Sequence, residues 1–226
     1  MTRGLFITGT DTDVGKTWVT LGLLHALAAT GVRTAAMKPV ACGAVATEAG
    51  LRNDDALRLQ RAAVIALPYA QVNPYLYAPP IAPHIAAQRV ARHIDITHIK
   101  TLFDAIAAQA DCVVVEGAGG WCVPLNERET IADLALKLGL PVVLVVGMRL
   151  GCLNHALLSA ENIARSGLPF AGWVANSITP DFAGLAENVA ALCERIPAPL
   201  LGVLPHLAAL DVQHIGRTLN AAVSLP

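Results

Sequence analysis

The residues best suited to chemistry lie near the amino terminus, in a loop that ends in lysine and threonine. Residues 9–17 read Gly-Thr-Asp-Thr-Asp-Val-Gly-Lys-Thr, directly after an apolar stretch and before a helical pattern that begins near Trp18. In such a loop, backbone N–H groups wrap a phosphate, the lysine neutralises β- and γ-phosphate oxygens, and the hydroxyl binds Mg²⁺. The sequence therefore predicts a nucleotide-phosphate loop whose working side chains are Lys16 and Thr17.

The spacing of this loop departs from the usual one. Five residues separate Gly9 from Gly15, where the standard pattern has four, so Thr10 takes the place of the first glycine. The alternative is an ordinary strand-to-helix turn with an accidental Gly-Lys-Thr. The strand–loop–helix context favours the phosphate loop.

Nucleotide phosphates need a metal ion, and a metal ion needs carboxylates. Glu116 ends the apolar run 113–115 and precedes a glycine-rich turn, which favours metal or substrate binding over a solvated strand end. Asp54 and Asp55 open a predicted helix, where stabilisation of the helix N-terminus is by itself the favoured interpretation. Lys38 directly follows the expected strand 34–37 and could stabilise a transferred phosphoryl group or a carboxylated amine. An ordinary surface lysine at a strand end fits its position equally well.

Short apolar runs alternate with amphipathic stretches of helical length along the whole chain. We expect strands near residues 5–8, 34–37, 112–116, 141–146, 172–175 and 200–204. Several of these runs are apolar throughout, as in parallel sheets covered on both faces. The pattern predicts one α/β domain spanning residues 1–226, with a mostly parallel central sheet, helices on both faces and ligands beyond the carboxyl ends of the strands. The proline-bearing stretch 71–84 is expected to be a long surface connection.

Composition narrows the classes of function. With 54% hydrophobic residues, 15% charged residues and a net charge of −1, the chain predicts a globular core without a basic surface for nucleic acid or anionic membrane. The five cysteines are scattered without a C-x-x-C pair, so we expect neither a disulfide framework nor a zinc site. The start of the chain lacks the pattern of a secretory signal, and we expect a cytoplasmic protein.

Several motifs, taken in order, make a specific match to one family. The chain resembles the dethiobiotin synthetases, from residue 5 to about residue 207, through GTDTDVGKT (9–17), KPVACG (38–43), LRNDDAL (51–57), VNPYLYAPPIAPH (72–84), VEGAGGW (115–121), GCLNH (151–155), GWVAN (172–176) and PAPLLGVLP (197–205). The resemblance implies the fold of P-loop NTPases and an enzyme that uses ATP, Mg²⁺, CO₂ and 7,8-diaminononanoate. It also implies a carbamate, its activation by the γ-phosphoryl group, and ring closure without a protein nucleophile.

The resemblance assigns roles to particular residues. Lys16 and Lys38 would act on phosphate and carbamate oxygens. Thr17, Asp55 and Glu116 would bind Mg²⁺. For Asp55, the resemblance therefore favours metal binding over helix capping. Asn176 would lie against the adenine, although from sequence alone it is only a turn residue. The implied nucleotide contacts are Asp13, Val14, Gly15, Lys16, Thr17, Trp18, Asp55, Glu116, Gly117, Ala118, Gly119, Asn176, Ser177, Pro205, His206 and Leu207.

The resemblance also implies a diamine site shared between two subunits of a homodimer. The helix expected from residue 151 to residue 164 would offer its N-terminus to the substrate carboxylate of the neighbouring subunit; a plain helix cap is the alternative. Cys42 stands where the family commonly has a hydroxyl, so a hydrogen bond to substrate there is expected to be weaker. The implied substrate contacts are Thr12, Lys38, Cys42, Gly151, Cys152, Leu153 and Asn154.

Two other classes share this kind of loop. In partitioning-type ATPases it reads Lys-Gly-Gly-x-Gly-Lys-Ser/Thr, and here Asp11 occupies the place of the first lysine. Amidoligases of the cobyric acid type carry an additional glutamine-hydrolysing domain, for which this chain has neither the length nor a suitable cysteine. Both alternatives are therefore disfavoured.

Overall fold

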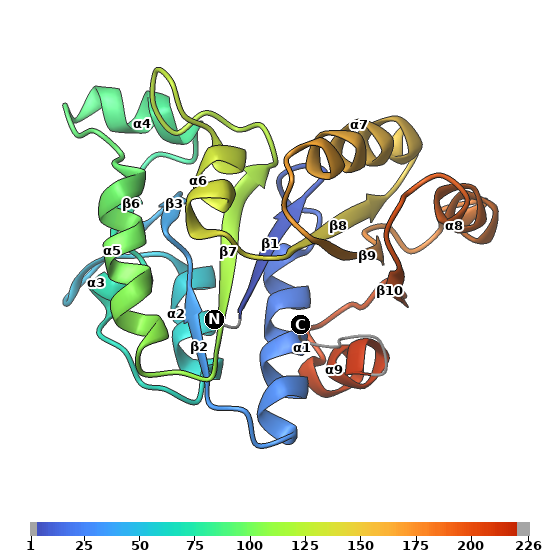
Figure 1. Ribbon diagram of the computed structural model, residues 1–226, viewed down its shortest axis with the longest axis horizontal. Coiled ribbons are helices and arrows are strands. Elements are labelled where there is room, and N and C mark those ends of the chain that lie inside the picture. Colours follow the sequence, from blue (N-terminus) through green and yellow to red (C-terminus); the bar gives the residue numbers. More distant parts are fainter. Residues whose placement is uncertain (1–3, 221–226) are drawn as a thin grey trace.

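The computed structural model describes residues 4–220 and contains a six-stranded sheet in which all neighbouring strands run parallel (Figure 1). The order is β10-β9-β8-β1-β7-β2. The strands are β1 (Gly4–Gly9), β2 (Thr34–Met37), β7 (Cys112–Gly120), β8 (Val142–Met148), β9 (Phe170–Ser177) and β10 (Leu200–Leu204). Each matches one of the six predicted strands, and the α/β fold with a parallel central sheet is confirmed.

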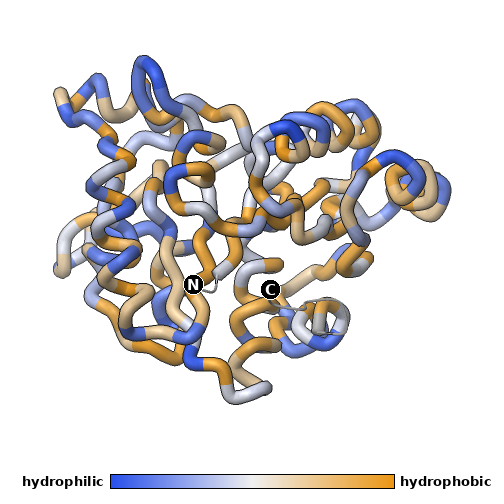
Figure 2. The backbone as a smooth tube through the Cα atoms, in the orientation of Figure 1, coloured by the Kyte–Doolittle hydropathy of each residue, from blue (hydrophilic) through white to orange (hydrophobic). Residues whose placement is uncertain are grey.

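Helices cover both faces of this sheet. One face packs against α1 (Lys16–Ala29), α2 (Asp54–Ala62) and α9 (Val212–Asn220), and the other against α5 (Ile96–Ala107), α6 (Ile131–Leu138), α7 (Cys152–Arg165) and α8 (Leu185–Cys193). Within β1, Leu5 and Ile7 pack on the face covered by α1, and Phe6 packs on the opposite face. This alternation follows from the two-residue period of a strand. Figure 2 shows the apolar segments concentrated along α1 and the central strands.

The glycine-rich end of β7 differs from the prediction. Glu116 was expected to end its strand, but β7 continues to Gly120, which pairs with Gly9 of β1. The expectation was wrong because the glycines pass through an irregularity, with Gly119 at φ 65°, and then pair again with the neighbouring strand β1. Glu116 consequently lies within the sheet, opposite Ile7, and is fully buried.

The stretch 71–84 is not the surface connection that its prolines suggested. It contains the end of α3 (Tyr69–Val72), β6 (Tyr75–Tyr77) and the start of α4 (Pro83–Arg89), and β6 pairs in parallel with β3 (Val40–Cys42). Tyr75 and Tyr77 are buried. The prolines fit because they lie between elements or at the first position of α4, where no N–H group is needed.

A short exposed hairpin, β4 (Val45–Thr47) and β5 (Gly50–Arg52), completes the set of elements and leads into α2. Within residues 4–220, no helix combines the length and the apolar character needed to cross a bilayer.

Candidate active site

The loop between β1 and α1 has the backbone of a phosphate cradle. Asp13 and Gly15 both have positive φ, 57° and 91°. A Cβ at Gly15 would lie 2.2 Å from Asn176 Nδ2, so only glycine fits there. Lys16 Nζ donates a hydrogen bond to the carbonyl of Asp11 at 2.8 Å, and Asp11 Oδ2 pairs with Arg149 at 2.5 Å. The loop is therefore held in shape by its own lysine and by the end of β8.

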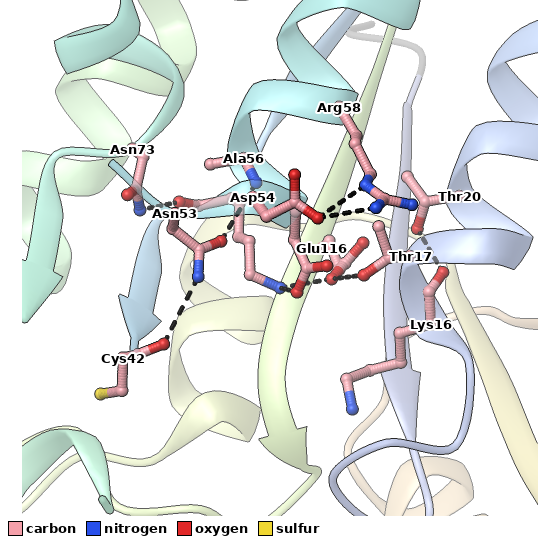
Figure 3. A network of polar contacts seen from close by, with 12 residues as sticks. Lys16, Thr17, Thr20, Cys42, Asn53, Asp54, Ala56, Arg58, Asn73 and Glu116 are labelled. Carbon is pink, nitrogen blue, oxygen red and sulfur yellow. Dashed lines mark hydrogen bonds and ion pairs between the residues drawn. The ribbon is translucent and has the colours of Figure 1, made fainter. Parts of the chain in front are cut away.

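Four side chains from separate elements meet beside this loop. Thr17 Oγ1 donates to Glu116 Oε1 at 2.8 Å, a contact drawn in Figure 3, and Lys38 Nζ donates to the same oxygen. Lys38 Nζ also lies 3.2 Å from Asp55 Oδ2. These residues come from α1, β7, the junction of β2 with β3, and α2. The structure thus brings together the residues to which the sequence assigned phosphate and metal chemistry.

Asp54 and Asp55 point to different surroundings. Asp54 forms an exposed ion pair with Arg58 at 2.8 Å (Figure 3), whereas Asp55 reaches Lys38. The capping role that either acid could have had belongs to the preceding residue, because Asn53 Oδ1 accepts the N–H of Ala56 at 3.1 Å.

The two lysines have opposite electrostatic environments. Burial lowers the pKa of Lys16 to about 8, although the nearby Glu116 carboxylate acts to raise it. Burial also acts to lower the pKa of Lys38, but the paired carboxylates of Glu116 and Asp55 outweigh it, so this pKa lies above its usual value. Lys38 is therefore positively charged at neutral pH, while Lys16 titrates near pH 8.

One oxygen of Glu116 has no protein partner. Within the described residues, Glu116 Oε2 is buried and makes no hydrogen bond, which is costly for a carboxylate unless a cation or another donor faces it. The hydroxyl of Thr17 and the carboxylates of Asp55 and Glu116 are the oxygen ligands that Mg²⁺ prefers, and Mg²⁺ usually takes only one or two carboxylates beside substrate phosphates. The donor set fits that ion. Residues 4–220 contain no cluster of three or more His, Cys, Asp or Glu side chains able to hold a metal.

A cavity of about 840 Å³ opens over this cluster at the carboxyl ends of the strands. Most of the implied ligand contacts line it: Thr12, Asp13, Gly15, Lys16, Thr17, Trp18, Lys38, Cys42, Asp55, Glu116, Ala118, Gly119, Asn176, Ser177, His206 and Leu207. The implied nucleotide contacts Val14, Gly117 and Pro205 are not among its lining residues. Val14 instead packs into the core, and a Cβ at Gly117 would meet Ile131 at 3.2 Å.

The segment implied to bind the substrate carboxylate lies elsewhere. Gly151, Cys152, Leu153 and Asn154 do not line this cavity. Gly151 has φ 92° and precedes α7 as its N-cap, so the helix begins where the sequence predicted. Their assignment to the site of a second subunit stays a prediction.

Several residues near the site were missed from the sequence. Asn53 lines the cavity, as do Ala41, Val123, Ile178 and the segment 80–83. The position of Asn53 directly before a helix was a recognisable capping signal. The contribution of residues 80–83 had no such signal, because their prolines predicted a surface connection.

The structure gives the surroundings of two predicted contact residues, Asn176 and Cys42. Asn176 Nδ2 donates to the carbonyl of Val14 at 2.9 Å, which ties the end of β9 to the phosphate loop. Cys42 lies half-buried at the end of β3, and burial raises the pKa of its thiol to about 11. The Cys42 sulfur is therefore a neutral thiol at physiological pH.

Comparison with known proteins identifies close relatives. A family model described as an AAA domain matches residues 3–214. The ATP-dependent dethiobiotin synthetase BioD of Pseudomonas aeruginosa (strain UCBPP-PA14) is 55% identical over 221 residues, covering 93% of this chain and 97% of the relative. BioD 1 of Escherichia coli (strain K12) is 50% identical over 208 residues, covering 92% of each chain.

Solved structures with the same fold are more distant in sequence. A ParA family ATPase from Chlorobium tepidum superimposes with a TM-score of 0.58 at 12% identity, covering 98% of both chains. The MinD cell division protein of Aquifex aeolicus gives a TM-score of 0.58 at 16% identity, covering 97% of this chain and 92% of that one. These similarities show the P-loop NTPase fold alone.

Proposed function

The chain belongs to the dethiobiotin synthetase family, and we propose that its ring-closing reaction runs through a phosphorylated carbamate held between Lys16 and Lys38. Its activity is the ATP-dependent formation of dethiobiotin in biotin biosynthesis, the work of a ligase.

The proposed sequence begins with 7,8-diaminononanoate and CO₂, which combine when one amine captures CO₂ as a carbamate. A carbamate oxygen attacks the γ-phosphorus of ATP, ADP leaves, and a carbamic–phosphoric anhydride remains. The second amine then attacks the carbonyl carbon, and the bond from that carbon to the phosphate oxygen breaks. The ring closes and phosphate is released. No protein nucleophile is needed, so the protein contributes positioning and charge stabilisation.

The charges of the site suit these steps. Lys38 keeps a fixed positive charge beside Glu116 and Asp55, where it can stabilise negative charge on the carbamate and on the transferred phosphoryl group. Lys16 comes from the phosphate loop and would leave the carbonyl of Asp11 for the β- and γ-phosphate oxygens.

Mg²⁺ would be held by Thr17, Asp55 and Glu116; Thr17 contacts Glu116 Oε1, and the buried Glu116 Oε2 has no partner among the described residues. When bound, it would neutralise negative charge on the phosphate oxygens.

The remaining contacts are proposed from family membership. Asn176 and Ser177 end β9, and His206 and Leu207 follow β10, at the edge of the sheet opposite to β2; all four line the cavity and would enclose the adenine. The helix start at 151–154 would bind the substrate carboxylate of a second subunit, since free N–H groups at a helix N-terminus suit an anion. The enzyme would then be a homodimer with two shared sites, working in the cytoplasm.

One observation carries this proposal: Lys38, Asp55, Glu116 and Thr17 are far apart in sequence, yet they form one contact cluster beside the phosphate loop. The direct test measures ADP release by the purified protein with 7,8-diaminononanoate plus bicarbonate. Parallel reactions contain glutamine plus a corrinoid acid, or DNA. We expect rapid ADP release only with the diamine and bicarbonate, and mass spectrometry should identify dethiobiotin. ADP release stimulated by DNA alone would contradict the proposal.

A further inference from the structure

Two polar side chains outside the cavity lining, those of Tyr69 and Asn73, connect the two sides of the Lys38–Asp55 ion pair. The hydroxyl of Tyr69 accepts a hydrogen bond from the backbone N–H of Asn53 at 2.8 Å and donates one to Asn73 Oδ1 at 3.1 Å. Asn73 Nδ2 donates to the carbonyl oxygen of Lys38 at 2.6 Å. A continuous path of hydrogen bonds thus runs from the residue that caps α2 to the main chain of Lys38. Figure 3 shows Asn53 and Asn73 on the side of Glu116 opposite to Lys16.

The main chain of Lys38 depends on this path because it belongs to no strand. Lys38 lies in the gap between β2, which ends at Met37, and β3, which begins at Val40. Its N–H donates to the carbonyl of Val72 at 2.9 Å, and its carbonyl accepts from Asn73. Both polar groups of the Lys38 main chain are therefore held by the segment 72–73.

The other end of the path fixes the helix that carries Asp55. Asn53 caps α2 through its Oδ1, and its Nδ2 donates to the carbonyl of Cys42 at 3.4 Å. Its own N–H has Tyr69 as partner. Asp55 follows two residues later, with its carboxylate 3.2 Å from Lys38 Nζ. One tyrosine hydroxyl thereby links the start of the helix that carries Asp55 to the residue that holds the Lys38 main chain.

We propose that Tyr69 and Asn73 are positioning residues for the ring-closing reaction, which hold Lys38 and Asp55 at their working separation without touching substrate. Neither residue lines the cavity. Because misplacement of a reacting or charge-stabilising group by about 1 Å can cost about 100-fold in rate, loss of this path should slow the chemical step more than it weakens nucleotide binding. The inference rests on the proposed role of Lys38.

The test compares two tyrosine-to-phenylalanine variants that each remove one hydroxyl. Tyr69→Phe breaks the path to Asn53 and Asn73. Tyr75→Phe is the matched control, because the Tyr75 hydroxyl also accepts a backbone N–H, that of Asp95 at 3.1 Å, but at the start of α5 and away from the site. For each variant we would measure kcat, the KM for ATP, the KM for the diamine and the Tm.

We expect Tyr69→Phe to lower kcat about tenfold and to raise the KM for ATP by a smaller factor, because Asp55 is the one proposed Mg²⁺ ligand that this path positions and the phosphate loop is supplied by other elements. Tyr75→Phe should lower the Tm by a similar amount and leave kcat within about twofold of the unmodified protein. Equal kcat values for the two variants would show that the Tyr69 hydroxyl is only structural and would overturn the inference.

A second comparison tests whether the two residues act as one path. Asn73→Ala should lower kcat at least as much as Tyr69→Phe, and the double variant should be no slower than Asn73→Ala alone. Additive losses would overturn the single path. Failure of the proposed function would look different, because the unmodified protein would then show no diamine-dependent ADP release.

Discussion

At the scale of single residues, the site separates two tasks between its lysines. Lys38 is held charged by Glu116 and Asp55. Among residues 4–220, Lys16 has no carboxylate in hydrogen-bond contact; it donates to the carbonyl of Asp11, and burial brings its pKa to about 8. Of the two lysines, Lys16 is therefore the one whose positive charge an incoming triphosphate would stabilise more.

This difference predicts a pH dependence of nucleotide binding. Lys16 carries its positive charge below pH 8 and loses it as the pH rises through 8, so the affinity for MgATP should fall on the alkaline side. With a pKa of about 8, only about a tenth of the lysine is charged at pH 9, and the dissociation constant should be roughly tenfold higher there than at pH 7. Isothermal titration calorimetry from pH 7 to 9.5 measures this.

The control is Lys16→Arg, whose side chain stays charged throughout this range. Its affinity can be lower at every pH, but its pH profile should be flat. A flat profile for the unmodified protein would contradict the assignment of the lowered pKa to Lys16.

At the scale of helices and strands, apolar periodicity located all six strands of the central sheet. The prediction was wrong in two segments, one rich in glycine and one rich in proline. The glycines after Glu116 were expected to form a turn, yet they extend β7 because β1 offers partners up to Gly9. The prolines of residues 71–84 were expected to exclude regular structure, yet they stand between short elements. In both cases the decisive partner lies far away in the sequence.

Helix packing supplies a prediction at the same scale. Gly22 of α1 faces Ile215 of α9, and a Cβ at Gly22 would lie 2.3 Å from Ile215 Cγ2 and 3.2 Å from the backbone nitrogen of Gly216. Gly22→Ala should therefore destabilise the protein by about 1–3 kcal/mol through overpacking, although alanine is the better helix former by about 1 kcal/mol. Urea unfolding measures the change.

A double variant separates overpacking from other effects. Ile215→Ala removes the nearest atom that a new methyl group would meet, Cγ2 at 2.3 Å, and leaves Ile215 Cβ at 2.9 Å, at the cost of a cavity. In that background, Gly22→Ala should be clearly less destabilising, because only the Cβ and backbone contacts remain. Destabilisation of the same size in both backgrounds would mean that the Gly22–Ile215 contact is not the cause.

At the scale of the whole molecule, the convergence of the site was predictable and its supporting contacts were not. Parallel strands end at one edge of a sheet, so Lys16, Lys38 and Glu116 were expected to meet there. The roles of Tyr69 and Asn73 depend on how α3 packs between α2 and the start of β3. No periodicity or motif encodes that arrangement, and the individual ligand contacts stay predictions.

A shared site in a homodimer can be tested by mixing inactive variants. Lys38→Met removes a proposed catalytic charge, and Gly151→Val replaces a glycine with φ 92° at the start of α7 by a residue that strains this conformation. A dimer that contains one copy of each variant would have one intact site if 151–154 serves the neighbouring subunit. Unfolding and refolding an equal mixture should restore about a quarter of the unmodified activity. No recovery, with dimers present by sedimentation, would show that 151–154 does not complete the site of the neighbouring subunit.

The most direct test of the phosphorylated carbamate follows an oxygen atom. In the proposed reaction, a carbamate oxygen bonds to the γ-phosphorus and leaves with the phosphate when the ring closes. Rapid single-turnover reactions with ¹⁸O-labelled CO₂, stopped before the label exchanges with water, should give phosphate that carries one ¹⁸O from CO₂, as measured by mass spectrometry. Phosphate without label, formed alongside dethiobiotin, would contradict activation of the carbamate by ATP.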